Sequence, residues 1–317
     1  MPWVIGIDEA GYGPNLGPLV QSAVAVQLPE SDTAGWKTLK PVVRRCGEKG
    51  EPWRLLVDDS KKVYTRGGLE ALERAVMIAS PSLPATLGEF LMGLTLPWVC
   101  GELAGEAWYD AADAIPTTVP LEKLQEERAT VGDAWRGIDA AFGPFLAAVT
   151  PTPRFNRICD ESGSKATVLG RGFVELLGGV LAELPKDDEP MVVTCDKQGG
   201  RNFYAGMIQE AFPDGWVIAE RESGLESRYR VEMLGRPVTI TFRPRADDES
   251  VAVALASMVC KYLRELSMKQ FNAYWATHVP GIKHTAGYPV DAKRFYAEIQ
   301  PAMQKLGFTE DQVWRKK

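Results

Sequence analysis

Little in this sequence points to a secreted or membrane protein. Its five cysteines are widely spaced and odd in number, so we expect no disulfide framework. No apolar run approaches the ~18 residues of a membrane helix, and the richest run, Val251–Cys260, is ten residues long. The first residues lack the basic segment and apolar run of a signal peptide. We therefore expect a cytoplasmic protein without a membrane partner.

Histidine is also scarce, and the net charge has the wrong sign for coating nucleic acid. Two histidines and no Cys-x-x-Cys spacing give a zinc site poor support. The net charge of −6 over 317 residues argues against binding nucleic acid through bulk positive charge. It does not exclude an enzyme with a local cationic patch. The composition, 45% hydrophobic and 25% charged, is that of a folded globular protein.

Strand-like and helix-like patterns alternate along the chain, which predicts an α/β sheet protein. Strands are expected over 3–7, 19–28, 191–195, 216–220 and 237–243. Helices are expected over 68–79, 167–184, 201–211 and 249–270. We treat 1–317 as a single catalytic domain. Within it, prolines, aromatic residues and helix-like pieces near 120–129 and 133–148 predict that 81–153 is an inserted helical subregion with its own small core.

Acidic residues stand where several of these elements begin or end. Asp8 and Glu9 follow the first strand, Asp196 closes the strand 191–195, and Asp247 and Asp248 precede a helix. Ligands of open α/β sheets bind at the carboxyl ends of strands, and clusters of oxygen ligands suit Mg²⁺ or Mn²⁺. Asp196 also fits a turn former, and either member of the 247–248 pair fits an ordinary helix cap. The spacing alone therefore leaves both a metal site and a structural role open.

Five motifs resemble those of the type 2 ribonucleases H (ribonuclease HII), and they occur in that family's order. Residues 5–20, IGIDEAGYGPNLGPLV, resemble the opening DEAGRGP motif, and Asp59-Ser60-Lys61 resembles the DSK motif. Asp196 matches a strand-end aspartate that precedes a helix. Residues 245–265, RADDESVAVALASMVCKYLRE, resemble the fourth motif, and 287–289 resemble a late GYP segment.

The resemblance implies a ribonuclease H-like fold, a mixed central sheet flanked by helices, here with inserted segments. It implies Asp8, Glu9, Asp196 and Asp247 as catalytic, metal-binding carboxylates for a pair of Mg²⁺ or Mn²⁺ ions. Asp247 is preferred to Asp248 because it falls on the motif's aspartate, and Asp248 is expected to act as a helix cap. The implied reaction is hydrolysis of the RNA strand of RNA–DNA hybrids, or of ribonucleotides in duplex DNA, leaving 5′-phosphate and 3′-hydroxyl ends.

The same resemblance implies a set of substrate-binding residues. These are Gly11, Tyr12 and Gly13 near the ribose 2′-hydroxyl, Tyr288 against the same sugar, and Ser60, Lys61, Lys261 and Arg264 near phosphates. Lys261 and Arg264 fit equally well as long side chains that extend outward from a buried helix, and Tyr288 also fits a core or lid aromatic. Residues 271–317 are expected to form a C-terminal substrate-binding extension.

Departures from the motifs keep two other functions open. Tyr12 stands where the family has arginine, which allows a divergent nuclease of the same fold without strict ribose selection. Residues 29–57, 81–153 and 214–240 match no motif, and the region near 216–243 is expected to add a hairpin. These insertions and the acidic charge leave room for a non-catalytic nucleic-acid-binding or assembly module.

Overall fold

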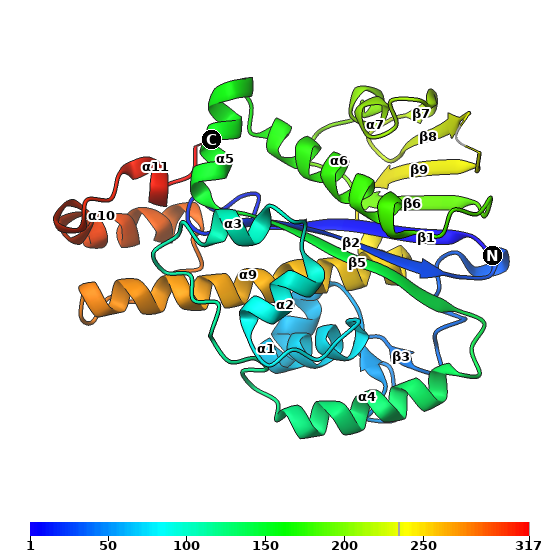
Figure 1. The fold of residues 1–317 in the computed structure, drawn as a ribbon, viewed down its shortest axis with the longest axis horizontal. Coiled ribbons are helices and arrows are strands. Elements are labelled where there is room, and N and C mark those ends of the chain that lie inside the picture. The colour runs from blue at the N-terminus through cyan, green and yellow to red at the C-terminus, as the bar shows by residue number, and fades with distance from the viewer. Residues whose placement is uncertain (234, 317) are drawn as a thin grey trace.

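The computed structural model describes residues 1–233 and 235–316, and its centre is one mixed β-sheet (Figure 1). The strands are β1 (Trp3–Ala10), β2 (Leu19–Gln27), β5 (Ala141–Thr150), β6 (Met191–Asp196), β7 (Trp216–Glu222), β8 (Ser227–Glu232) and β9 (Val238–Arg243). Their order in this seven-stranded sheet is β5-β2-β1-β6-β9-β8-β7. Two short strands, β3 (Val43–Arg44) and β4 (Leu55–Leu56), pair separately. The predicted mixed sheet is confirmed.

Three neighbouring strands run parallel at the middle of the sheet. β6 pairs in parallel with β1 on one side and with β9 on the other, and the remaining pairs are antiparallel. β1 is buried from Trp3 to Asp8 and becomes partly exposed at its last two residues. This burial is expected of a β-branched run with both faces covered. Because parallel strands share a direction, the carboxyl ends of β1, β6 and β9 meet at one edge of the sheet.

Helices cover both faces of the sheet, with α9 on one side and α6 on the other (Figure 1). The helical elements are α1 (Ser60–Ala79), α2 (Leu87–Leu94), α3 (Val99–Leu103), α4 (Leu121–Trp135), α5 (Thr152–Ser162), α6 (Ala166–Glu183), α7 (Ala205–Ala211), α8 (Ala246–Glu249), α9 (Val251–His278), α10 (Pro289–Leu306) and α11 (Glu310–Val313), with a 3₁₀ turn at Glu30–Asp32. None of the helices in the part of the chain described is long and apolar enough to cross a membrane.

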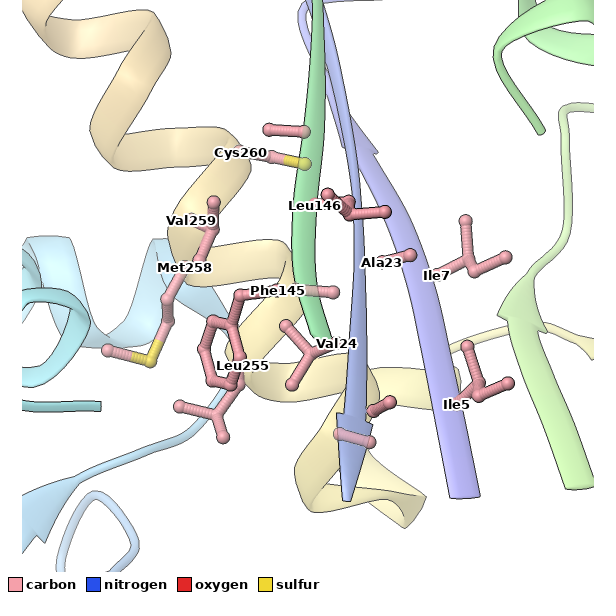
Figure 2. Packing of buried hydrophobic residues seen from close by; sticks show 14 of the residues in the cluster. Ile5, Ile7, Ala23, Val24, Phe145, Leu146, Leu255, Met258, Val259 and Cys260 are labelled. Atoms are coloured by element: carbon pink, nitrogen blue, oxygen red, sulfur yellow. The ribbon is translucent and has the colours of Figure 1, made fainter. Parts of the chain in front are cut away.

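The packing of α9 against the sheet is tight because small and branched residues meet there. A Cβ atom added to Gly6 would lie 2.1 Å from the backbone nitrogen of Val253, so only glycine lets the helix approach β1 this closely. Figure 2 shows Val24 and Phe145 of the sheet beside Leu255 of α9. The first ten residues of α9 are all buried, which fixes the helix beside the strand ends.

The region 81–153 differs from its prediction in two respects. The helix expected near 133–148 is wrong, because β5 runs over Ala141–Thr150 as an edge strand antiparallel to β2. Its continuous apolar run, FLAAV, has no alternation, and periodicity cannot separate a short buried strand from a helix. The separate small core is also wrong, since Leu91 and Leu124 pack into the main core. The helix expected over 120–129 is α4.

The expected hairpin near 216–243 is present, and it contains one strand more than the two predicted. β7, β8 and β9 form an antiparallel extension of the sheet, in which the β8 residues Ser227–Glu232 alternate between buried and more exposed positions. A second hydrophobic cluster joins the end of α9 to α10 through Phe271, Trp275 and Phe295. This cluster attaches the C-terminal helices to the rest of the fold.

Candidate active site

Four acidic residues from three separate segments meet at the carboxyl edge of the sheet. The last parallel pair of β1 and β6 is Ile7 with Cys195, so Asp8 and Asp196 each stand one residue beyond it. After β9 the chain turns into α8, where the Ala246 amide donates to Asp196 Oδ1 at 3.3 Å. The next residue is Asp247.

A single cavity of 830 Å³ contains all of these acids. The twelve residues predicted for the site line it together: Asp8, Glu9, Gly11, Tyr12, Gly13, Ser60, Lys61, Asp196, Asp247, Lys261, Arg264 and Tyr288. The fold brings these residues together from segments far apart in the sequence. The role of each residue remains a prediction. The cavity is also lined by Tyr64, Glu265 and His284, which were not among the residues predicted for the site.

The acids in this cavity carry strongly perturbed pKa values. Burial and the charges of Glu9 and Asp196 raise the pKa of Asp8 well above its ordinary value. Burial and the charge of Asp196 raise the pKa of Glu9 to about 7, and burial with neighbouring aspartates raises that of Asp247 to about 6. Burial likewise raises the pKa of Asp196. The protein alone therefore leaves this negative charge poorly compensated.

The start of α1 brings Lys61 and Ser60 to the cavity. Asp59 caps the helix by accepting from the Lys61 amide at 2.7 Å and the Lys62 amide at 3.3 Å. The charge of Lys61 lowers the pKa of Glu9 and Asp196, against the larger effect of burial. Ser60 is buried, with its hydroxyl 2.8 Å from that of Ser257 on α9. Helix capping thus positions a cation beside the acids.

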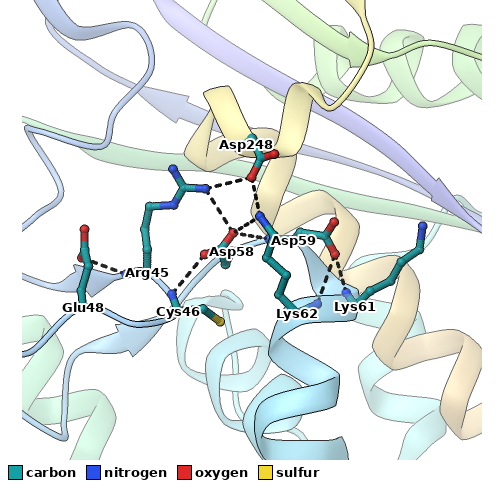
Figure 3. A network of polar contacts seen from close by, with 8 residues as sticks. All are labelled: Arg45, Cys46, Glu48, Asp58, Asp59, Lys61, Lys62 and Asp248. Atoms are coloured by element: carbon teal, nitrogen blue, oxygen red, sulfur yellow. Dashed lines mark hydrogen bonds and ion pairs between the residues drawn. The ribbon is translucent and has the colours of Figure 1, made fainter.

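Asp248 lies outside this cavity in a separate ion-pair network (Figure 3). Its Oδ1 atom is 2.6 Å from Lys62 Nζ and 3.0 Å from the Arg45 guanidinium, and Asp58 shares both cations. The hydrogen bond from Lys62 lowers the pKa of Asp248. The expectation that Asp248 caps the long helix is wrong, because Asp248 lies within α8 and Ser250 is the N-cap residue of α9. Asp247 and Asp248 therefore differ sharply in electrostatic environment.

The turn after β1 reaches the cavity in a conformation that favours glycine. Gly11 has φ of +90°, and an added Cβ would lie 2.7 Å from both the Pro18 carbonyl oxygen and an Arg264 nitrogen. A Cβ added to Gly13 would meet nothing within 4 Å, so this residue borders open space. The Tyr12 ring lies 4.6 Å from Lys165 Nζ. A nearby lysine thus supplies positive charge beside Tyr12.

Two buried arginines hold this turn from behind. Arg264 donates to the carbonyl oxygens of Pro18, Leu16 (3.2 Å) and Ala286 (3.0 Å). Arg315 donates to the carbonyl oxygens of Gly11 (2.5 Å) and Pro14. Burial lowers the pKa of Arg264 to about 10, and burial with the Arg264 charge lowers that of Arg315 to about 9.

The contacts of Arg315 with this turn could not be predicted from any local pattern in the sequence. Its partners are backbone carbonyls about three hundred residues away in the chain. Asn156 on α5 fixes the segment that carries it, because its side-chain amide donates to the carbonyl oxygens of Asp311 at 3.0 Å and Trp314 at 2.8 Å. The C-terminal segment is thereby joined to the turn after β1.

The remaining predicted residues line the cavity away from the strand ends. Lys261 forms an ion pair with Glu265, and its Nζ atom lies 4.6 Å from the centre of the Tyr64 ring. The Tyr64 hydroxyl donates to Glu265 at 3.2 Å. Tyr288, at the start of α10, is 56% exposed. An exposed aromatic at a cavity wall is suited to stacking against a ligand.

The donor chemistry of the cavity fits Mg²⁺ or Mn²⁺, since the four acids supply oxygen ligands only. Within residues 1–233 and 235–316, no three His, Cys, Asp or Glu side chains are grouped tightly enough to enclose a metal ion. Mg²⁺ is commonly held by one or two carboxylates, with water and substrate phosphate completing its coordination. The residues therefore fit an ion that the substrate helps to hold.

No protein-family model and no curated protein matches this chain. Among solved structures, it is similar to that of the PCNA:RNase HII complex from Archaeoglobus fulgidus, at 13% identity and a TM-score of 0.42 over 99% of this chain and 94% of that one. It is similar to ribonuclease H2 from Pyrococcus horikoshii OT3, at 15% and 0.43 over 98% and 92%. Bst-RNase HIII in complex with Mn²⁺ gives 16% and 0.44 over 99% and 66%.

Proposed function

We propose that this protein is a metal-dependent endonuclease that hydrolyses the RNA strand of RNA–DNA hybrids or cuts at ribonucleotides within duplex DNA. Water would add to phosphorus and the bond to the 3′ oxygen would break, which leaves 5′-phosphate and 3′-hydroxyl ends. The motif resemblance supplies this reaction class, and the cavity supplies the physical support for it.

The observation that carries the proposal is the convergence of Asp8, Glu9, Asp196 and Asp247 on one cavity. Burying like charges together is unfavourable, and the raised pKa values of these groups express that cost. Such an arrangement is typical of a site whose missing positive charge comes with its ligands. A purely structural role for each acid would not require them to share one cavity.

The four carboxylates would hold the ions, with Asp8 and Asp196 at the centre because each stands one residue beyond the last parallel pair of two adjacent strands. Bound Mg²⁺ or Mn²⁺ would supply activation of the attacking water and stabilisation of the leaving oxygen. Lys61, beside Glu9 and Asp196, is suited to holding a non-bridging phosphate oxygen. Ser60 would support the same phosphate from the first turn of α1.

Recognition of the sugar would fall to the turn after β1 and to Tyr288. Gly13 borders open space, so the backbone of the turn can approach a ribose 2′-hydroxyl closely. Tyr288 lines the same cavity and exposes its ring for packing against the sugar. Arg264 and Arg315 would act as positioning residues, since their guanidiniums hold carbonyls of the turn.

The test uses three duplexes of one sequence: an RNA–DNA hybrid, a DNA duplex with one ribonucleotide, and an all-DNA duplex. With Mg²⁺ or Mn²⁺ we expect cleavage of the first two. Asp8→Asn and Asp247→Asn should each lower kcat by about a thousandfold, equivalent to ~4 kcal/mol of transition-state stabilisation. Asp248→Asn is the matched control, because its carboxylate lies outside the cavity.

Three other outcomes would favour a different function or a different residue assignment. Equal cleavage of the all-DNA duplex would favour the divergent nuclease without ribose selection, for which the tyrosine at position 12 is the specific reason. Binding of duplexes without turnover in either metal would favour the non-catalytic module. Equal loss of activity in Asp247→Asn and Asp248→Asn would contradict the assignment of Asp247.

A further inference from the structure

A second cavity, separate from the one that contains the acids, lies between β4 and α1. It has a volume of 290 Å³ and is lined by Arg44, Arg66 and Arg74 together with apolar atoms of Leu55 and Ala71. Arg44 comes from β3, and the other two arginines lie on α1, before and after its kink at Gly68. Three guanidinium groups thus border one small hollow.

The charges of these arginines are largely uncompensated. Arg74 pairs with Glu127 at 2.5 Å and donates to the Pro52 carbonyl oxygen at 2.6 Å. In the part of the chain described, Arg44 and Arg66 have no carboxylate within ion-pair distance. Glu70 borders the cavity without pairing with either of them. Two of the three cations are therefore free to take an anion.

Arg44 is the clearest sign that a ligand belongs here. Its Nε atom is buried and has no hydrogen-bond partner among the described residues, which is costly for a charged donor. Burial and the charges of Arg74, Arg66 and Arg54 lower its pKa. An oxyanion in the cavity would offset the repulsion between the arginines by pairing with the guanidinium groups that line it.

We propose that this cavity binds a phosphate group through Arg44 and Arg66. Guanidinium groups match phosphate because several N–H donors in a fixed plane meet several acceptor oxygens. Arg54 does not contribute donors in the same way, since its guanidinium already donates to the carbonyl oxygens of Lys40 and Val43.

The phosphate has two possible sources, a free phosphate ion and the backbone of a nucleic acid. The second source rests on the proposed function. Ser60 begins α1 in the acidic cavity, and Arg66 follows six residues later, ~9 Å further along the helix. Both cavities therefore border α1, and the backbone of a duplex held at the acids is the second source that the experiment tests.

The experiment compares the full-length protein with Arg66→Gln and Arg44→Gln, all without divalent metal so that nothing is cleaved. Arg136→Gln is the matched control, since its side chain is 80% exposed and pairs only with Asp133 at the surface. Inorganic phosphate is titrated by calorimetry. Affinity for a 30-base-pair DNA duplex is measured at several salt concentrations. Circular dichroism verifies that each variant is folded.

A free-phosphate site predicts that inorganic phosphate binds the wild type and Arg136→Gln, and about tenfold more weakly in the other two variants. A backbone site predicts that Arg66→Gln lowers duplex affinity severalfold and reduces the salt dependence by about one phosphate contact. Arg136→Gln should do neither. If folded Arg66→Gln and Arg44→Gln match the control in both titrations, the proposal is overturned. That result would leave metal-dependent cleavage, the proposed function, untouched.

Discussion

The guanidinium of Arg315 donates a hydrogen bond to the carbonyl oxygen of Gly11, which lies 2.5 Å away and 304 positions earlier in the chain. The same guanidinium donates to the Pro14 carbonyl. Its Nε and Nη1 atoms are buried and have no hydrogen-bond partner within residues 1–233 and 235–316, which is costly for a charged group. The hydrogen bonds that Arg315 donates to this turn best explain why a buried arginine stands at this position.

We expect Arg315→Met to loosen that turn and to impair recognition more than chemistry. In cleavage of a duplex with one ribonucleotide, KM should rise about tenfold while kcat changes less, because the acids are not in contact with Arg315. Preference over the all-DNA duplex should fall with it. Arg315→Lys should recover part of the loss, since an ammonium can still reach one carbonyl.

Lys316→Met is the matched control for this prediction. Lys316 is the next residue, and its ammonium pairs at the surface with Asp160 at 2.6 Å. An Arg315→Met protein that is less stable but keeps its KM and its substrate preference would reduce Arg315 to a purely structural role.

Glu9 makes stability without metal depend on pH. Its pKa is about 7 in the fold against an ordinary value of 4.5, so between these pH values the folded chain holds a proton that the unfolded chain releases. The unfolding free energy should therefore fall as pH rises from 4.5 to 7, by roughly 1–3 kcal/mol. Urea denaturation in EDTA measures this slope.

Glu9→Gln should make that slope shallower, leaving the part due to the neighbouring acids. Added Mg²⁺ should reverse the trend, because metal binds the deprotonated carboxylates and so favours higher pH. A wild-type profile that is flat from pH 4.5 to 7, with no shift on adding Mg²⁺ or Mn²⁺, would count against a cluster of buried acids.

The pKa of Glu73 on α1 is lowered, whereas that of Glu9 is raised, because the buried Glu73 carboxylate is fully hydrogen-bonded. It accepts from the backbone amides of Thr117 (2.6 Å), Thr118 (2.7 Å) and Val119 (3.1 Å) and from the Tyr262 hydroxyl (2.9 Å). These bonds lower its pKa against the opposing effect of burial. One carboxylate thereby joins α1, the segment before α4, and α9.

Glu73→Gln should lower the unfolding free energy by about 2–4 kcal/mol at pH 7, since an amide cannot accept at all of these donors. The folded pKa lies below the unfolded one, so the stabilisation is complete above pH 4.5 and is lost as pH falls below it. Denaturant titrations at pH 7 and pH 3.5 measure both values. Exposed Glu126→Gln should change neither, and an equal deficit at both pH values would exclude the charged form as the cause.

The fold and the acidic site could be predicted from sequence where local pattern was sufficient. Asp8 and Asp196 directly follow short apolar runs, so their positions near the carboxyl ends of strands could be predicted. Parallel pairing of those strands then brought them together. By contrast, β5 was missed because its run of buried residues carries no alternation that separates strand from helix.

The choice between Asp247 and Asp248 shows what sequence could not explain. Adjacent identical residues have no local difference, and the motif alone favoured the first. The structure separates them because Arg45 and Lys62 neutralise Asp248, and Arg45 belongs to a segment that no motif covers. Arg264 was predicted to lie near phosphates, but its guanidinium donates to backbone carbonyls instead. Arg315 does the same, and only the folded chain brings these partners near.

Tyr12 gives the last prediction, because it stands where the resembled family has arginine. Lys165 Nζ lies 4.6 Å from its ring, so some positive charge already reaches this part of the cavity. Tyr12→Arg would add a guanidinium that can contact a substrate phosphate directly. We expect a severalfold lower KM for the hybrid and a salt dependence steeper by about one contact. Tyr12→Phe, which adds no charge, should leave the salt dependence unchanged. Steady-state cleavage at several salt concentrations measures both quantities, and an identical salt dependence in Tyr12→Arg and Tyr12→Phe would mean that residue 12 faces no phosphate.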